Sequence, residues 1–174
     1  MKKYTIKIKE ENVLYDPKQP LDNDIIEMLK KALPSKKESK KVDWKVYKKE
    51  FWQDLIPTKR KSQYSDIKEI QVSDSGQVRI KDIKKPNEWR EIELENDPNY
   101  PDGYLRLKGY ASLGHVYRMV ARAHILGDAE EPRDDKGKLF PIHHIDNNGY
   151  NNSKDNLMYV SPTDHAKIHS LTSI

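Results

Sequence analysis

The fold of the last third of this chain is decided by one stretch, Phe140-Pro-Ile-His143-His144-Ile-Asp146-Asn-Asn-Gly-Tyr-Asn-Asn-Ser-Lys-Asp-Asn156-Leu-Met-Tyr-Val-Ser161-Pro-Thr-Asp-His165-Ala-Lys-Ile-His169. Four of the six histidines of the chain lie in it, as an adjacent pair and as a pair four positions apart. Imidazole nitrogens are common ligands of transition metals, so this spacing predicts a metal site.

Local signals place these histidines on definite elements. Residues 139–145 and 157–160 are short apolar runs typical of strands, and residues 146–155 between them are rich in Asn, Asp, Gly and Ser, which favour turns. Ser161, followed by a proline and then by an aspartate three positions on, is typical of a helix start. The predicted order is strand, loop, strand, helix.

Helical spacing brings His165 and His169 to one face, because residues four apart lie one turn above each other. Adjacent residues of a strand point to opposite faces, so only one of His143 and His144 turns fully toward a metal held by that helix. The other is free for chemistry.

This segment resembles the HNH nucleases, also called ββα-metal or His-Me finger nucleases, over about 30 residues. The resemblance implies that His143, His165 and His169 bind one divalent ion (magnesium, manganese, zinc or similar), that His144 is the general base and that Asn156 braces the loop. Three neutral imidazoles also suit nickel and cobalt, because borderline ligands bind borderline metals well. Taken alone, the helical pair also fits a structural zinc site or a plain surface, and Asn156 alone also fits an ordinary turn residue.

The function implied is a metal-dependent endonuclease, a phage-type HNH homing or free-standing enzyme, that hydrolyses double-stranded DNA to 5′-phosphate and 3′-hydroxyl ends. Two alternatives stay open: a restriction-like or non-specific HNH nuclease, and a non-catalytic DNA-binding module with a structural zinc. A structural site would not need His144, which argues against the second. The remaining histidines, His115 and His124, have no other candidate ligands near them in the sequence and are expected to be structural or solvated.

Charge is unevenly distributed along the 174 residues, whose net charge is +4. Between Lys30 and Lys61 there are twelve Lys or Arg against four Asp or Glu, interleaved with four aromatic residues, which are Trp44, Tyr47, Phe51 and Trp52. Such a segment can bind phosphates through lysines, and the candidates are Lys45, Lys48 and Lys49. The alternative is a solvated basic helix with its aromatics in the core.

Cysteine is absent, which fits an intracellular location. The first residues lack the apolar run of a signal peptide, and no stretch approaches the roughly 20 apolar residues of a membrane span. We therefore expect no membrane partner and a cytoplasmic location, in the host cell if the gene is carried by a phage. Monomer and homodimer both remain possible.

Three regions are expected in an α+β chain: a strand and helix region with a basic linker (1–48), a hairpin-rich module that contacts DNA (49–112) and the nuclease domain (113–174). The first holds a short initial strand, a helix over Asp22–Leu33 and a Lys- and Ser-rich linker over 34–41. The alternation around Ser73-Asp-Ser-Gly76 predicts a hairpin. Further strands are expected at 89–94 and 104–108, and a helix over His115–Leu126.

The upstream order is similar to the module that precedes the nuclease motif in phage and intron-associated HNH homing endonucleases. The segments that carry this similarity are Trp52-Gln-Asp-Leu-Ile, Ile70-Gln-Val-Ser-Asp-Ser-Gly-Gln-Val-Arg79, Gly103-Tyr-Leu-Arg and Val116-Tyr-Arg118-Met-Val-Ala121. In that family the hairpin and the Arg-bearing segment approach DNA, which makes candidates of Arg79, Lys81, Lys84, Arg106 and Arg118. The alternative for each is a solvated charge or, for Arg118, a structural ion pair.

Overall fold

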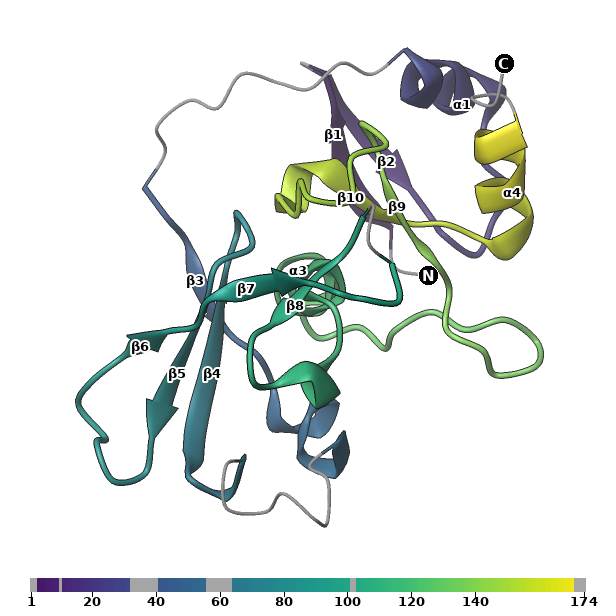
Figure 1. The fold of residues 1–174 in the computed structure, drawn as a ribbon. Coiled ribbons are helices and arrows are strands. Elements are labelled where there is room, and N and C mark those ends of the chain that lie inside the picture. Colours follow the sequence, from purple (N-terminus) through teal and green to yellow (C-terminus); the bar gives the residue numbers. More distant parts are fainter. Residues whose placement is uncertain (1–2, 10, 32–40, 56–63, 101–102, 171–174) are drawn as a thin grey trace.

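A computed structural model describes residues 3–9, 11–31, 41–55, 64–100 and 103–170. It shows an α+β fold in which the strands form small antiparallel sheets, as predicted (Figure 1). One cluster of buried apolar side chains extends from Tyr4 to Ile168. The three regions expected from the sequence therefore share a core.

The largest sheet has four strands in the order β3 (Trp44–Val46), β4 (Ile67–Ser73), β5 (Val78–Asp82) and β6 (Arg90–Glu91). The predicted hairpin is β4–β5, with Ile70 opposite Ile80, and Gly76 supplies the positive φ of 92° in its turn. β3 pairs with β4, so the expected boundary at residue 48 runs between two strands of one sheet.

The basic segment is not a helix where the structure describes it. It contributes β3 and two short 3₁₀ helices, η1 (Lys49–Phe51) and η2 (Gln53–Leu55). Tyr47 and Trp52 are buried, which agrees with the part of the solvated-helix alternative that placed the aromatic residues in the core. The tertiary pairing with β4 outweighs the helical preference of the lysines, because propensity is a weak determinant beside packing.

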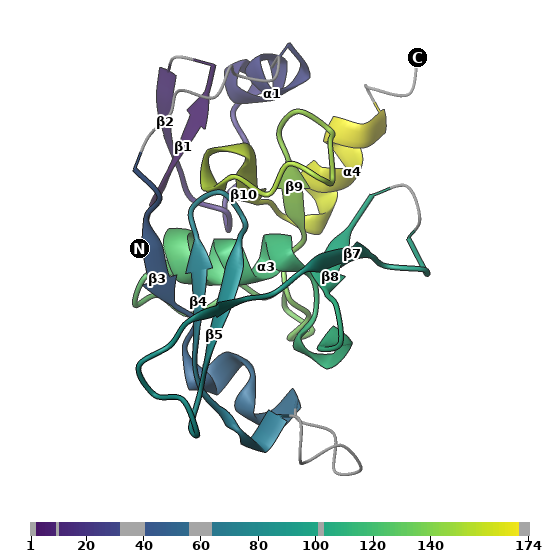
Figure 2. The ribbon, with the colours of Figure 1, turned by 60° about the vertical axis from the view of Figure 1, so that its left-hand side comes forward.

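The predicted helix over His115–Leu126 forms in two parts, α3 (Val116–Val120) and a π-helical continuation, η5 (Ala121–Leu126). It lies in the middle of the molecule, with the four-stranded sheet on one side and β9, β10 and α4 on the other (Figure 2). The strand predicted at 89–94 is interrupted: it contains β6 and reaches β7 (Leu94–Asn96) only at Leu94. The strand predicted at 104–108 is β8 (Leu105–Leu107), which pairs with β7 in a two-stranded sheet and is followed by a 3₁₀ turn, η4 (Ala111–Leu113).

The C-terminal order is strand, loop, strand, helix, as predicted. β9 (Ile142–His144) pairs with β10 (Leu157–Tyr159) after a loop that ends in a 3₁₀ turn, η6 (Lys154–Asn156), and α4 (Pro162–Ser170) follows. Ser161 caps α4: its Oγ accepts a hydrogen bond from the Asp164 backbone N at 3.1 Å and donates to Asp164 Oδ2 at 2.9 Å.

The N-terminal region packs against this motif. β1 (Tyr4–Ile8) pairs with β2 (Glu11–Tyr15), a strand that the sequence did not predict, and α1 (Asn23–Lys30) lies against α4 (Figure 1). The backbone N of Leu21 donates to Asp164 Oδ2 at 3.2 Å. Most of the predicted linker lies outside the described residues. None of the helices over the described ranges is long and apolar enough to cross a membrane.

Candidate metal centre

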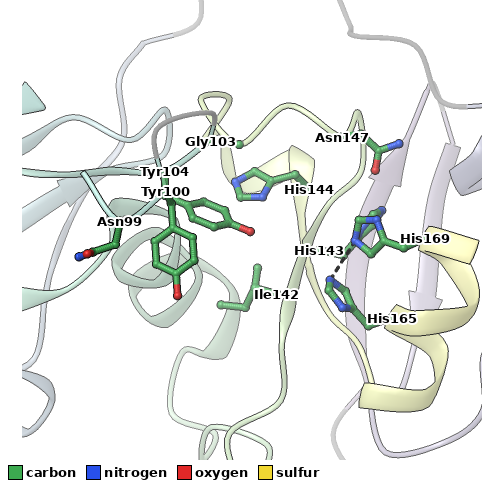
Figure 3. A pocket seen from close by; sticks show the side chains of 11 residues that line it. Asn99, Tyr100, Gly103, Tyr104, Ile142, His143, His144, Asn147, His165 and His169 are labelled. Atoms are coloured by element: carbon green, nitrogen blue, oxygen red, sulfur yellow. Dashed lines mark hydrogen bonds between the residues drawn. The ribbon is translucent and has the colours of Figure 1, made fainter. Parts of the chain in front are cut away.

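Three of the four predicted histidines meet on one side of β9. His143 projects from the strand toward His165 and His169 on α4 (Figure 3), and one ring nitrogen from each lies within 4.8 Å of the other two. The Nε2 atoms of His165 and His169 are 3.2 Å apart. Two nitrogens that bind one tetrahedral zinc ion at 2.0–2.1 Å lie about 3.4 Å apart, so this separation suits a shared ion.

His143 is in the state that a metal ligand requires. Its side chain is buried, and its Nε2 has no hydrogen-bond partner among the residues that the structure describes. Burial, reinforced by the neighbouring histidines, lowers its pKa to about 3, so its imidazole is neutral at pH 7. A buried nitrogen without a partner is costly, and a bound cation would satisfy it. The residues present therefore fit a divalent ion.

His144 points to the other side of β9, as strand alternation predicted (Figure 3). Its side chain is buried, and its Nε2 lies 3.2 Å from the side-chain oxygen of Asn152. Because a carbonyl oxygen only accepts, Nε2 carries the proton in this arrangement and Nδ1 keeps its lone pair. Burial lowers the pKa of His144, so the ring is neutral near pH 7 and can accept a proton.

Asn156 ties the two ends of the loop together. Its Oδ1 accepts from the Asp146 backbone N at 3.0 Å, and its Nδ2 donates to Asp146 Oδ1 and to the Asn151 carbonyl, both at 2.8 Å. These bonds hold the loop directly behind the histidine doublet. They are the contacts that a loop brace would make.

A pocket of about 620 Å³ joins both sides of β9. It is bounded by the four histidines and by residues that the sequence did not single out, among them Asn99, Tyr100, Tyr104 and Asn147 (Figure 3). Asn147 carried a usable signal, because asparagine tolerates the positive φ of 57° that it adopts beside the doublet. Tyr100 and Tyr104 carried no such signal in the sequence, because the β7–β8 connection reaches the site only through the tertiary fold.

An aromatic cluster contributes Tyr104 and His144 to the pocket wall. The ring of Tyr104 lies 5.2 Å from those of His115 and Tyr117 and 6.1 Å from that of His144, centroid to centroid. His115 Nε2 is hydrogen-bonded to Asp97 Oδ2 at 2.7 Å, so its role is structural, as expected. His124 is also structural: its Nε2 lies 2.9 Å from the Val72 carbonyl oxygen.

Two loops meet at this wall. Asp97 Oδ1 accepts from the backbone N of Asn99 at 2.9 Å and shapes the β7–β8 connection. Gly149, in the loop behind the doublet, lies so close to the backbone of Gly103 that a Cβ at Gly149 would overlap the Gly103 carbonyl. The tyrosines are thereby held against the histidine loop by direct backbone contact.

The predicted DNA contacts on the sheet form a stack of cations and aromatic rings. The Arg79 guanidinium lies 4.1 Å from the ring centroid of Trp44 and 4.6 Å from that of Trp89, and both its Nε and its Nη2 donate to Gln71. Lys81 Nζ lies 4.2 Å from the Trp89 ring. Such stacks present charge and flat apolar surface together.

The remaining predicted contacts differ in their surroundings. Lys45 and Lys49 are exposed. Arg118 pairs with Glu131, which also binds Arg122, and this is the structural ion pair that the sequence left as an alternative. Others are held in ion pairs or by a backbone carbonyl: Lys84 with Asp66 at 3.0 Å, Arg106 with Glu95 at 2.9 Å, and Lys48 with the Gly127 carbonyl at 3.1 Å.

Comparison of the chain with models of known protein families, with curated proteins and with solved structures found no match.

Proposed function

We propose that this chain is a metal-dependent DNA endonuclease of the HNH type, and that β9, β10 and α4 form its ββα-metal motif. The observation that carries the proposal is the division of labour across β9. Three imidazoles that could share a cation lie on one side, and a neutral imidazole with an oriented lone pair lies on the other. Both sides open into one pocket.

The bond changes follow from this arrangement. Nδ1 of His144 takes a proton from a water molecule as its oxygen attacks the phosphorus, and Asn152 holds the ring in the required tautomer. The bond between phosphorus and the 3′ oxygen breaks, and that oxygen leaves with a proton from solvent. The products are a 5′-phosphate and a 3′-hydroxyl.

His143, His165 and His169 would hold the divalent ion. When bound, the ion supplies Lewis acidity, which polarises the phosphate and stabilises negative charge on the leaving oxygen. The lowered pKa of His143 keeps its imidazole in the neutral form that ligates at neutral pH.

A structural zinc site is the alternative that the trio alone would allow. Such a site has no use for a buried histidine on the far side of the strand, oriented by an asparagine and facing a pocket. The pocket and the Asn152 contact therefore favour catalysis over structure.

The direct test is digestion of supercoiled plasmid with EDTA and with single metals added back. We expect cleavage to stop with EDTA and to return with at least one divalent ion. Nicked circles alone would indicate that single strands are cut, and linear product would indicate a dimer or sequential cuts. Equal cutting of every duplex would favour a non-specific nuclease, whereas salt-resistant cutting at one long site would favour a homing enzyme.

Two variants separate the roles of the histidines. His144→Ala should lose about 100-fold to 10,000-fold in cleavage rate and keep its metal affinity, because a base is lost and no ligand is. His165→Ala should lose metal affinity and activity together. Calorimetry in which His144→Ala no longer binds metal would contradict the assignment, as would intact cleavage by that variant.

A further inference from the structure

The pocket is larger than a phosphodiester group requires. Its volume of about 620 Å³ lies in the range of sites that enclose whole small molecules, and it extends from the histidines to Tyr100 and Tyr104. Part of the pocket is therefore available to a group attached to the phosphate.

The tyrosine wall offers an aromatic surface that packs against neighbouring rings. The ring of Tyr100 packs at 66° on Tyr104 and at 82° on His115, with centroids 5.4 and 5.7 Å apart. It nevertheless remains 52% exposed. The half-buried Tyr104 supports it from behind, and both rings face the pocket on the His144 side of β9 (Figure 3).

We propose that Tyr100, supported by Tyr104, forms a nucleoside subsite. It stacks the base of the nucleoside that stays attached to the scissile phosphate through its 5′ oxygen. The inference rests on the proposed function and extends it to the substrate. Stacking on an aromatic ring tolerates every base, because each base has a flat π face. The subsite therefore binds a nucleoside 5′-phosphate whatever its base is.

The tyrosines lie on the same side of β9 as His144, and this placement identifies the nucleoside that stacks on them. In an in-line displacement the leaving oxygen lies opposite the attacking water, and the water lies beside His144. The nucleoside that departs with its 3′ oxygen therefore points away from His144 and from the tyrosines. The nucleoside that keeps the phosphate through its 5′ oxygen can lie on the tyrosine side.

Stacking in the pocket requires the base to leave its duplex. Unstacking and unpairing cost several kcal/mol, and least for a base that is mismatched or already unpaired. The chain should therefore prefer DNA with unpaired nucleotides at the point of cleavage to a fully matched duplex.

The binding test compares thymidine 5′-phosphate with 1,2-dideoxyribose 5-phosphate, which has the same sugar and phosphate but no base. Calorimetry on the full chain in the presence of manganese should give a dissociation constant about 5-fold to 150-fold lower for the thymidine compound, the range expected from one stacked base. Tyr100→Ala should bring this ratio close to one. Tyr100→Phe, which keeps the ring and loses only the hydroxyl, should preserve it.

Three results would overturn the subsite: equal affinity of the wild type for the two ligands, no binding of thymidine 5′-phosphate at millimolar concentration, or an unchanged ratio in both Tyr100→Ala and Tyr104→Leu. Plasmid cleavage can survive each of them, so the nuclease proposal and the subsite fail separately. As a second measurement, an oligonucleotide duplex with a central bubble should be cut faster than its matched counterpart. A faster rate on the matched duplex would also count against the subsite.

Discussion

Asn152 should affect the rate of DNA cleavage only by orienting the His144 ring. The carbonyl oxygen of its side chain lies 3.2 Å from His144 Nε2, in a buried setting, and over the described residues it makes no hydrogen bond to His143, His165 or His169. A neutral hydrogen bond of this kind contributes about 0.5–1.5 kcal/mol. Asn152→Ala should therefore cut more slowly by about 2-fold to 12-fold, because each 1.4 kcal/mol changes a rate tenfold.

A double-mutant cycle makes this test sharp. Plasmid cleavage is timed for Asn152→Ala, His144→Ala and the double variant under single-turnover conditions, with metal affinity measured by calorimetry. In the His144→Ala background, the change at Asn152 should cost nothing further. Asn151→Ala is the matched control, because it removes hydrogen bonds to Asp146 and to the Ser153 backbone N in the same loop without touching His144. An equal loss from Asn152→Ala in both backgrounds would refute the positioning role.

Three further outcomes are expected. Asp164→Ala should lower the free energy of unfolding by about 2–4 kcal/mol in urea titrations, because this buried side chain accepts hydrogen bonds from two partners; a loss below about 0.5 kcal/mol would contradict this. Burial lowers the pKa of His124, so the unfolded chain binds more protons below pH 6.5 and stability should fall as the pH drops from there, by at most about 1.4 kcal/mol per unit for this group. In urea titrations at several pH values, His124→Gln should show a shallower slope, and identical slopes would exclude His124 as the cause. If Lys45, Lys48 and Lys49 contact phosphates, their neutralisation should reduce the slope of log affinity against log salt by about 0.9 per contact, and an unchanged slope would show a solvated face.

The elements that the sequence predicted are those with local causes. The Ser161 cap and the glycine of the β4–β5 turn act within a few residues, and both are where they were expected. The i, i+4 spacing of His165 and His169 fixed their common face, and alternation along β9 separated His143 from His144. The grouping of these histidines follows from such local rules, so it could be predicted from the amino-acid sequence alone.

The features that escaped prediction depend on long-range contacts. Tyr100 and Tyr104 reach the pocket because the β7–β8 connection packs against the histidine loop, more than 40 residues further along the chain. Arg118 was a DNA candidate through the family resemblance of its segment, with an ion pair as the alternative; its partner, Glu131, lies 13 residues further along, and periodicity in the sequence does not identify such a partner. β2 pairs with β1 although its sequence does not alternate regularly.

The turn between β4 and β5 contacts the loop that holds Asn152, and so bears on the proposed chemistry. A Cβ placed on Gly76 would lie 2.8 Å from the Cβ of Asn152, and the Asp74 carbonyl accepts a hydrogen bond from the Lys154 backbone N at 2.8 Å. The residues of this turn are therefore constrained by the orientation of His144 and by the fold at once. If the sheet contacts DNA as the sequence predicts, substitutions on the strand faces can change those contacts while the turn keeps its shape. A library that randomises the strand faces should yield many active variants, whereas one that randomises residues 74–76 should yield few.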